Sequence, residues 1–273
     1  MSNPAPRNRR AKLAVVRRSE RITPHMIRLV LSCDEFVDNG TTDHYVKLLF
    51  PKPGVTYPEP LDMGVIREQF PAEQWPTMRT YTVRNWDEAA RELTIDFVYH
   101  GDEGIAGPWA AAAQPGDKLW FNGPGGGYAP NPDAEWHLLV GDESALPAIG
   151  AAIEQLAPGA KAKVFVEVED ETEEQKLDGP GDVELTWFHR TGERGENLVR
   201  AVEELEFRSD DVHVFVHGEA GFVTQLRRHL HAERGLPRDR VSISGYWRLG
   251  KNEDGWQAEK AETSRKEREA AGA

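Results

Sequence analysis

The octapeptide MRTYTVRN, residues 78–85, combines side chains that could hold a flat, charged ligand. In an extended segment Arg79 and Tyr81 lie on the same face, about 6.6 Å apart. An arginine fork suits a phosphate, and a tyrosine ring suits an aromatic ligand. The hydroxyl and amide of Thr82 can hydrogen-bond the edge of such a ring. For these residues alone, the favoured interpretation is a barrel strand with a structural tyrosine and a snorkelling arginine.

A second candidate anion site lies in HGDEGIAGPWAAAAQPGD, which begins at His100. Gly104 and Gly107 permit a tight turn, Pro108 suits the first position of a helix, and WAAAA predicts a short helix that stops at Pro115. A helix start presents free amide groups and the positive end of the helix dipole to an anion. Together with the preceding arginine strand, this segment would supply a second grip on a pyrophosphate.

The segment VGDESALPAIGAAIEQL has the form of a strand, a turn at Gly141, and a helix with Ser144 near its start. Nucleotide-binding sheets place a phosphate at such a helix start. The glycine pattern G-x-G-x-x-G is absent, so an ordinary strand-to-helix turn is an equally good interpretation.

The segment ISGYWRLGKNEDGWQAEK, near the end of the chain, interleaves aromatic and basic residues. These are Tyr246, Trp247, Arg248, Lys251, Trp256 and Lys260. They fit either the walls of a ligand pocket or the edge of a core with solvated charges, and composition does not decide between the two.

The elements that carry these segments differ between the two halves of the chain. Short β-rich runs at 13–18, 26–32, 44–50, 79–85, 92–99 and 118–121 predict six strands of a small antiparallel barrel. The stretch 53–76, rich in proline and acidic residues, is expected to be a long loop.

The second half alternates strands with helices, which predicts a parallel sheet with crossover helices. Strands are expected at 136–141, 162–168, 183–189, 212–218 and 240–246, and helices at 144–156, 195–206 and 220–234. We expect a barrel domain over 1–132, an α/β domain over 133–250 and a charged extension over 251–273.

Composition excludes several classes of protein. The chain has 273 residues, 39% of them hydrophobic, and a formal net charge of −13, which argues against a binder of nucleic acid or anionic membrane. It contains no apolar run long enough to span a bilayer, and MSNPAPRNRRAKLAVV does not resemble a secretory signal. With Cys33 as the single cysteine, no internal disulfide framework or cysteine-based zinc site is expected. A cytoplasmic location is the natural inference.

In this order, the segments RTYTVR, DFVYHGDEGIAGPWA, VGDESALPAI, VHGEA and GYWRLGKNEDGWQAEK resemble the siderophore-interacting protein family. That family is a branch of the ferredoxin–NADP reductase superfamily, and the resemblance covers almost the whole chain. It implies an N-terminal six-stranded β-barrel that binds FAD tightly, followed by an α/β domain with a parallel sheet that binds NAD(P)H.

The resemblance also implies roles for individual residues. Arg79 would hold the FAD pyrophosphate, Tyr81 would stack on the isoalloxazine, and Thr82 would hydrogen-bond near the flavin N5. The other implied FAD contacts are Thr80, Phe97, Val98, His100, Ala106, Gly107, Pro108 and Trp109. The implied nicotinamide-nucleotide site consists of Gly141, Asp142, Glu143, Ser144, Gly218 and Glu219, with Arg190 near the ribose or a 2′-phosphate. Tyr246 and Trp247 would be aromatic residues of the flavin pocket.

The activity implied is transfer of electrons from NADH or NADPH through FAD to a ferric siderophore, which loosens the iron by reducing it. Lys47 and Arg248 match basic positions that attract the anionic chelate, and Lys251 is a further candidate. The loop GPGGGY departs from family members that carry a basic residue there, because Gly125 and Gly126 supply no charge. We find no catalytic triad and no metal-ligand cluster in the sequence, and none is needed when the cofactor performs the redox chemistry.

Three alternatives stay open at this stage. The chain could be a flavin or NAD(P)H oxidoreductase with another acceptor, or it could draw electrons from reduced ferredoxin. It could instead be a siderophore-binding protein without turnover.

Overall fold

The computed structural model describes residues 10–207, 209–251 and 255–256. Contacts between residues divide the chain into two units, Met1–Gly126 and Gly127–Ala273, which we call the barrel unit and the sheet unit. This division falls a few residues before the predicted boundary at 132/133. Each unit has a hydrophobic core of its own.

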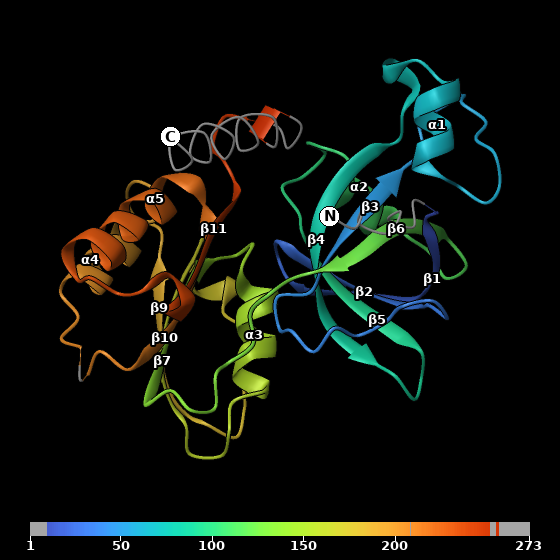
Figure 1. Ribbon diagram of the computed structural model, residues 1–273. Helices are drawn as coiled ribbons and strands as arrows, with labels where there is room; N and C mark the ends of the chain where they lie inside the picture. Colours follow the sequence, from blue (N-terminus) through green and yellow to red (C-terminus); the bar gives the residue numbers. More distant parts are fainter. Residues whose placement is uncertain (1–9, 208, 252–254, 257–273) are drawn as a thin grey trace, which may run out of the picture. The chain divides into compact units, whose positions relative to one another are not determined.

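The described part of the barrel unit contains six strands. They are β1 (Lys12–Thr23), β2 (Met26–Ser32), β3 (Tyr45–Phe50), β4 (Thr77–Asp87), β5 (Glu92–Val98) and β6 (Lys118–Gly125). The strands close into a barrel in the order β1-β2-β5-β4-β3-β6, and every neighbouring pair is antiparallel (Figure 1). The predicted six-stranded antiparallel barrel is confirmed.

Alternation along the strands fills the barrel. Leu93, Ile95 and Phe97 of β5 point inward, as their spacing predicts, and none is more than 1% exposed. Between them Asp96 is also buried, where the guanidinium of Arg28 binds both of its carboxylate oxygens at 2.7 Å. A buried carboxylate is tolerated there because this two-pronged ion pair satisfies it.

The segment 53–76 is not the structureless loop that the sequence analysis expected. It contains helix α1 (Met63–Gln69) and a 3-10 turn, Ala72–Gln74. Asp62 caps α1, because its side chain accepts hydrogen bonds from the amides of Gly64 and Val65 at 2.7 and 3.3 Å. The apolar residues of this helix pack with Leu49 in a small cluster beside the main barrel core. The loop expectation took no account of a helix cap at Asp62.

Helix α2 (Ala106–Ala112) follows β5 and confirms the predicted short helix. It begins at Ala106, so Pro108 is the third residue of the helix and not the first. Proline is still tolerated there, because amides in the first turn have no intrahelical acceptor.

The sheet unit is a five-stranded parallel sheet over the residues described. Its strands are β7 (Trp136–Asp142), β8 (Lys161–Val168), β9 (Asp182–His189), β10 (Val212–Glu219) and β11 (Val241–Trp247). They lie in the order β11-β10-β7-β8-β9, and the predicted parallel sheet is confirmed. The order reverses between β7 and β10, and such a switch point is where open α/β sheets bind ligands.

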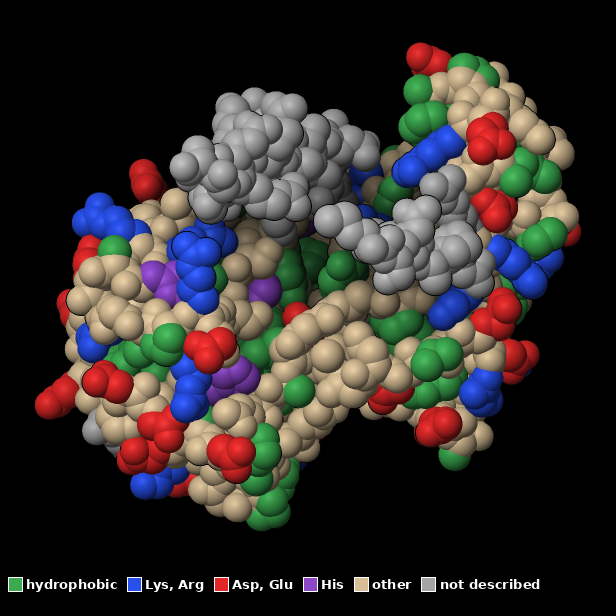
Figure 2. Space-filling view, in the orientation of Figure 1, with side chains coloured by type: hydrophobic (Ala, Val, Ile, Leu, Met, Phe, Trp, Pro, Cys, Tyr) green, Lys and Arg blue, Asp and Glu red, His purple; other side chains and the backbone are tan. Residues whose placement is uncertain are grey.

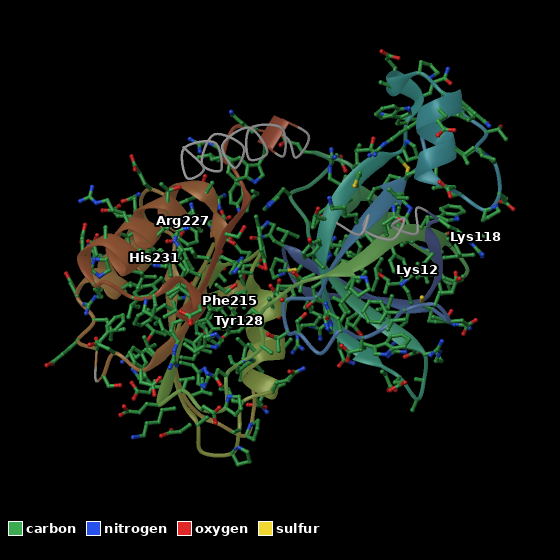
Figure 3. All side chains as sticks on the ribbon, in the orientation of Figure 1. Lys12, Lys118, Tyr128, Phe215, Arg227 and His231 are labelled. Atoms are coloured by element: carbon green, nitrogen blue, oxygen red, sulfur yellow. The ribbon has the colours of Figure 1, made fainter. Side chains whose placement is uncertain are left out.

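Helices cover both faces of this sheet (Figure 1). Helix α3 (Leu146–Glu154) packs on one face, and α4 (Glu196–Glu203) and α5 (Ala220–Arg228) pack on the other. The turns Glu171–Glu173, His229–Glu233 and Arg238–Arg240 complete the unit. On the α3 face, Tyr128 packs on Phe215 of β10 with 4.8 Å between ring centroids (Figure 3).

On the face seen in Figure 2, Lys and Arg side chains are interspersed with Asp and Glu side chains. No helix in the part of the chain that the structure describes is long and apolar enough to cross a membrane.

Candidate functional sites

The first site is built on the first half of β4. In its ladder with β3, Arg79 lies opposite Leu48 and Tyr81 opposite Val46, whose side chains point into the barrel. Arg79 and Tyr81 therefore share a face, as predicted, and both are half-buried. The guanidinium of Arg79 donates to its neighbour's carbonyl, Met78 O, at 2.7 Å.

The hydrogen-bonded partner of β4 changes along the strand, which leaves an opening between β4 and β5 at one end of the barrel. Thr77–Thr82 pairs with β3 on one side, whereas Val83–Asp87 pairs with β5 on the other. The two strands β4 and β5 therefore diverge beside Arg79 and Tyr81. A flat ligand can reach backbone amides and side chains together at such a divergence.

The end of β5 and the start of α2 lie next to this opening. The rings of Tyr81 and Phe97 are 4.5 Å apart, those of Phe97 and Trp109 6.2 Å, and those of Trp109 and Phe50 5.6 Å. Phe97 is fully buried, and its ring packs against that of Tyr81. Val98 is half-buried and His100 exposed.

The start of α2 approaches β5 very closely. A Cβ atom on Gly107 would lie 3.1 Å from the carbonyl oxygen of Val98, so glycine lets the helix start sit against the strand. Ala106 is buried beside it, and Pro108 is half-buried. The barrel unit thus brings together β4, the end of β5 and the start of α2, the three segments assigned to FAD. Arginine, tyrosine and free helix amides fit a dinucleotide with a flat ring.

Lys47 lies on the outer face of β3, exposed, opposite Thr80 of β4 and Asn122 of β6. The next residue on that face is Tyr45, opposite Thr82, and Thr82 itself is 7% exposed. Tyr45 was not singled out from the sequence, although alternation in HYVKLLF places it on the same face as Lys47.

Close contacts account for two of the glycines in GPGGGY. Its ring lies over Gly125, where an added Cβ would be 2.4 Å from the ring carbon Cζ. At Gly126 an added Cβ would meet the side chains of Thr41 and Asp43 at 2.7 and 2.8 Å. Tyr45 thus blocks a side chain at position 125, and Thr41 and Asp43 block one at position 126.

In the sheet unit, Asp142 ties three strands together at their carboxyl ends. One carboxylate oxygen accepts from the amide and hydroxyl of Ser144 at 3.0 and 2.6 Å. The other accepts from the amide of Glu219 at 2.8 Å and the indole of Trp247 at 2.9 Å. Burial, and then the adjacent Glu143 carboxylate, raise the pKa of Asp142 to about 6.

Gly218 permits this arrangement. Its φ is +140°, and a Cβ there would lie 2.7 Å from the carboxylate of Asp142. Glu219 caps α5 by accepting from the amide of Gly221, and also accepts from the amide of Leu249 at 3.2 Å. The predicted residues Gly141, Asp142, Glu143, Ser144, Gly218 and Glu219 are thus brought together at the switch point of the sheet.

Arg190 follows β9 and lies among carboxylates. It contacts Glu143, and its guanidinium is 3.0 Å from Glu169 and 3.5 Å from Glu167. Glu167, Glu169 and Arg194 belong to this corner and were not singled out from the sequence. The acidic run that follows β8 is the signal that could have revealed them.

The C-terminal aromatic segment divides between two environments. Trp247 is bound to Asp142, and the guanidinium of Arg194 lies 5.3 Å from its ring. Tyr246 packs on His217 with 4.8 Å between ring centroids. Arg248 and Lys251 are exposed. Lys260 lies outside the described residues, as does most of the predicted extension.

Among the residues that the structure describes, no three His, Cys, Asp or Glu side chains are grouped as ligands for a metal ion.

The fold defines a class of protein. A closed antiparallel barrel followed by a parallel sheet with a switch point is the ferredoxin–NADP reductase-like fold. A ferredoxin reductase of carbazole 1,9a-dioxygenase has this fold, with a TM-score of 0.63 at 13% identity, over 87% of this chain and 69% of that one.

Both halves match family models. Residues 15–128 match the siderophore-interacting FAD-binding domain, and residues 134–250 match the siderophore-interacting protein model. The crystal structure of the siderophore-interacting protein SipS from Aeromonas hydrophila is similar, with a TM-score of 0.80 at 31% identity, over 94% of this chain and 99% of that one.

Curated relatives agree. An uncharacterized protein of Mycobacterium tuberculosis is 44% identical over 88% of this chain and 92% of its own length. The NADPH-dependent ferric-chelate reductase of Escherichia coli is 34% identical over 85% and 91%, and the ferric vibriobactin reductase of Vibrio cholerae 37% over 69% and 70%. The chain belongs to the siderophore-interacting protein family.

Proposed function

We propose that this chain is an FAD-dependent ferric-siderophore reductase that uses NADH or NADPH as its electron donor. The observation that carries the proposal is the grouping of Arg79, Tyr81 and the start of α2 around the opening between β4 and β5. This grouping lies within a chain whose relatives include named ferric-siderophore and ferric-chelate reductases.

The barrel unit binds FAD in this proposal. Arg79 holds the pyrophosphate together with the first amides of α2, and Tyr81 packs against the isoalloxazine. Thr82 donates a hydrogen bond near the flavin N5, and Val98 and His100 lie on the adenine side. The ring of Phe97 packs against the ring of Tyr81 and so fixes its orientation. When bound, FAD accepts hydride from a nicotinamide nucleotide and passes single electrons to a ferric chelate.

The sheet unit binds the nucleotide donor. Gly141 and Gly218 lie at the carboxyl ends of β7 and β10 and allow close packing there. Open α/β sheets bind nucleotides at this edge. Asp142 does not contact the ligand in this proposal, because its oxygens are used to join β7, β10 and β11. Tyr246 and Trp247 stay predictions as residues of the flavin pocket.

The acceptor is an iron chelate held outside the barrel. Lys47 offers an exposed positive charge, and Tyr45 beside it offers an aromatic face. Arg248 and Lys251 are further candidates for attracting an anionic chelate. Oxygen-rich siderophores hold Fe³⁺ as a hard ion, so a one-electron reduction to Fe²⁺ loosens the complex. We place this reaction in the cytoplasm because the single, buried cysteine suits a reducing compartment.

The test begins with the colour of the purified protein. We expect a yellow sample that releases FAD on denaturation and bleaches anaerobically with NADH or NADPH. A ferric siderophore should then restore the colour while a ferrous-specific chelator reports Fe²⁺. A colourless protein that takes up no FAD overturns the proposal. Bleaching only by reduced ferredoxin would identify another donor, and bleaching without siderophore-dependent Fe²⁺ would identify another acceptor.

A further inference from the structure

The corner of the sheet unit that follows β8 is strongly acidic. Five of the six residues from 169 to 174 are Asp or Glu. The segment begins where β8 ends, and β8 lies directly beside β7. In nucleotide-binding sheets this corner receives the adenosine ribose. An acidic residue there binds a free 2′-hydroxyl, whereas an arginine accommodates a 2′-phosphate. This chain has both types of residue, and they contact one another.

Arg190 is held by three carboxylates. It contacts Glu143 directly, and it lies 3.0 Å from Glu169 and 3.5 Å from Glu167. Its side chain is only 12% exposed. The amide of Gly195 donates to Glu167 at 2.9 Å and fixes that carboxylate, whose second oxygen is buried without a hydrogen-bond partner among the described residues.

The other cations of the corner also have acidic partners. Arg194 lies 4.0 Å from Glu143 and packs over the ring of Trp247. Lys176, two residues after the acidic segment, pairs with Asp178 at 2.6 Å. Positive charge near the end of β8 is therefore already offset by carboxylates. Of the three carboxylates around Arg190, Glu169 is the exposed one, with a side chain that is 53% exposed.

We propose that this chain discriminates against the 2′-phosphate and takes its electrons from NADH in preference to NADPH. The proposal rests on the function proposed above and names the donor for the same site. Glu169 and its acidic neighbours are the specificity-determining residues, and Arg190 is a structural cation that holds Glu143, Glu167 and Glu169 together.

The physical reason is the balance of charge. A phosphate monoester carries about −1.5 to −2 at pH 7, and here it would meet a cation already surrounded by three carboxylates. A free ribose hydroxyl brings no charge and can donate a hydrogen bond to the exposed carboxylate of Glu169. To bind a 2′-phosphate, Arg190 would have to leave carboxylates that are buried, and this would leave their charges uncompensated.

The first test measures binding alone. Calorimetric titration of the FAD-loaded protein with 5′-AMP and with 2′,5′-ADP (adenosine 2′,5′-bisphosphate) compares two probes that differ only in the 2′-phosphate. We expect 5′-AMP to bind about tenfold more tightly at low salt, with the difference shrinking as salt screens the charges. Equal or tighter binding of 2′,5′-ADP by the unaltered protein overturns the proposal.

Two charge-matched variants locate the effect. Glu169→Lys removes an exposed carboxylate that holds Arg190 and adds a cation, so it should improve 2′,5′-ADP binding about tenfold relative to 5′-AMP. Glu203→Lys makes the same charge change at the exposed end of α4 and should leave the ratio unchanged. A similar shift in both variants would point to net charge alone and would contradict the assignment to this corner.

Anaerobic flavin reduction separates this proposal from the one on which it rests. Faster bleaching by NADH than by NADPH, with the preference reduced in Glu169→Lys, supports both. Equal rates, or a preference for NADPH, overturn the donor assignment and leave the reductase intact. If neither nucleotide bleaches the flavin, the proposed use of NAD(P)H fails, and the donor assignment fails with it.

Discussion

The ring of Tyr45 fills the space that a side chain at position 125 would need. The ring lies over Gly125, lies opposite Thr82 in the ladder of β3 and β4, and shares the outer face of β3 with Lys47. One exposed ammonium and one aromatic ring therefore stand next to the threonine assigned to the flavin edge. The loop GPGGGY therefore carries no cation at Gly125. The ring of Tyr45 fills that space and offers a surface on which a flat chelating group can pack.

At the scale of the residue, the most direct prediction concerns Arg79. Replacing it in Arg79→Ala removes a charged hydrogen bond to phosphate, so the Kd for FAD should rise about tenfold or more while the circular dichroism spectrum stays the same. Fluorescence titration with FAD measures this. Arg18→Ala removes an exposed arginine that pairs with Glu92 and serves as the control. An unchanged Kd for FAD in Arg79→Ala would show that the phosphate is held elsewhere.

Lys47 gives the second residue-scale prediction. Lys47→Ala should slow reduction of an anionic ferric siderophore several-fold, on the order of three- to tenfold, because it lowers the attraction between enzyme and chelate. FAD content should not change, and the rate in the variant should depend less on salt. Lys118→Ala, at the exposed start of β6, is the matched control. Loss of FAD from Lys47→Ala would place this residue at the cofactor and not at the acceptor.

Among the elements, the carboxyl ends of β7, β10 and β11 depend on a single side chain. Asp142→Ala would leave two backbone amides and the Trp247 indole without their acceptor, which we expect to lower the free energy of unfolding by about 2 kcal/mol or more. Trp247→Phe removes only one of these hydrogen bonds and should cost less. Chemical denaturation measures both. An Asp142→Ala variant as stable as the parent would show that this carboxylate carries no structural role.

His137, at the start of β7, makes the stability of the sheet unit depend on pH. Burial, and then the neighbouring His213, lower the pKa of His137 from 6.5 to about 4. Below pH 6.5 the unfolded chain binds a proton that the folded chain refuses, so stability decreases as the pH falls from 6.5 to 4. This one group contributes about 2 kcal/mol of the loss at pH 5.

The check compares the free energy of unfolding at pH 7 and pH 5 in His137→Gln and in the parent. His137→Gln should show the smaller decrease. Asp142 acts in the opposite direction, because its raised pKa favours the folded state as the pH falls through 6. Identical pH dependence in His137→Gln and the parent would contradict the role of His137.

Periodicity allowed most of the elements to be predicted from the sequence. The alternation of Leu93, Ile95 and Phe97 located β5 and its buried face, and alternating strands and helices predicted the parallel sheet. Helix α1 was missed because its cap, Asp62, stands among prolines and acids. Glu143 and Arg190 were named from the sequence, but their ion pairs with each other and with Glu167 were not, because these residues are distant in sequence and only the folding of β7, β8 and β9 brings them together. The types of residue in a sequence indicate which side chains could bind a ligand. Ion pairs between residues on different strands can be identified only once the structure is known.

At the scale of the whole molecule, the chain consists of two units with separate cores. The barrel unit is centred on residues such as Leu29, Leu48 and Phe121, and the sheet unit has one core on each face of its sheet. Every residue proposed to hold the FAD phosphates lies in the first unit, and every residue proposed to hold the donor nucleotide lies in the second. The two binding functions are therefore expected to be separable.

Expressing the two units separately tests this division. Residues 10–126 contain the whole closed barrel and its core, so we expect them to fold and to bind FAD, with Arg79→Ala again weakening the Kd about tenfold. Residues 127–273 should bind ADP and no FAD. Circular dichroism establishes that each piece is folded before calorimetry measures the two ligands. A folded barrel piece that binds no FAD, or a sheet piece that binds it, would overturn the assignment, because the phosphate grip would then depend on residues outside β4, β5 and α2.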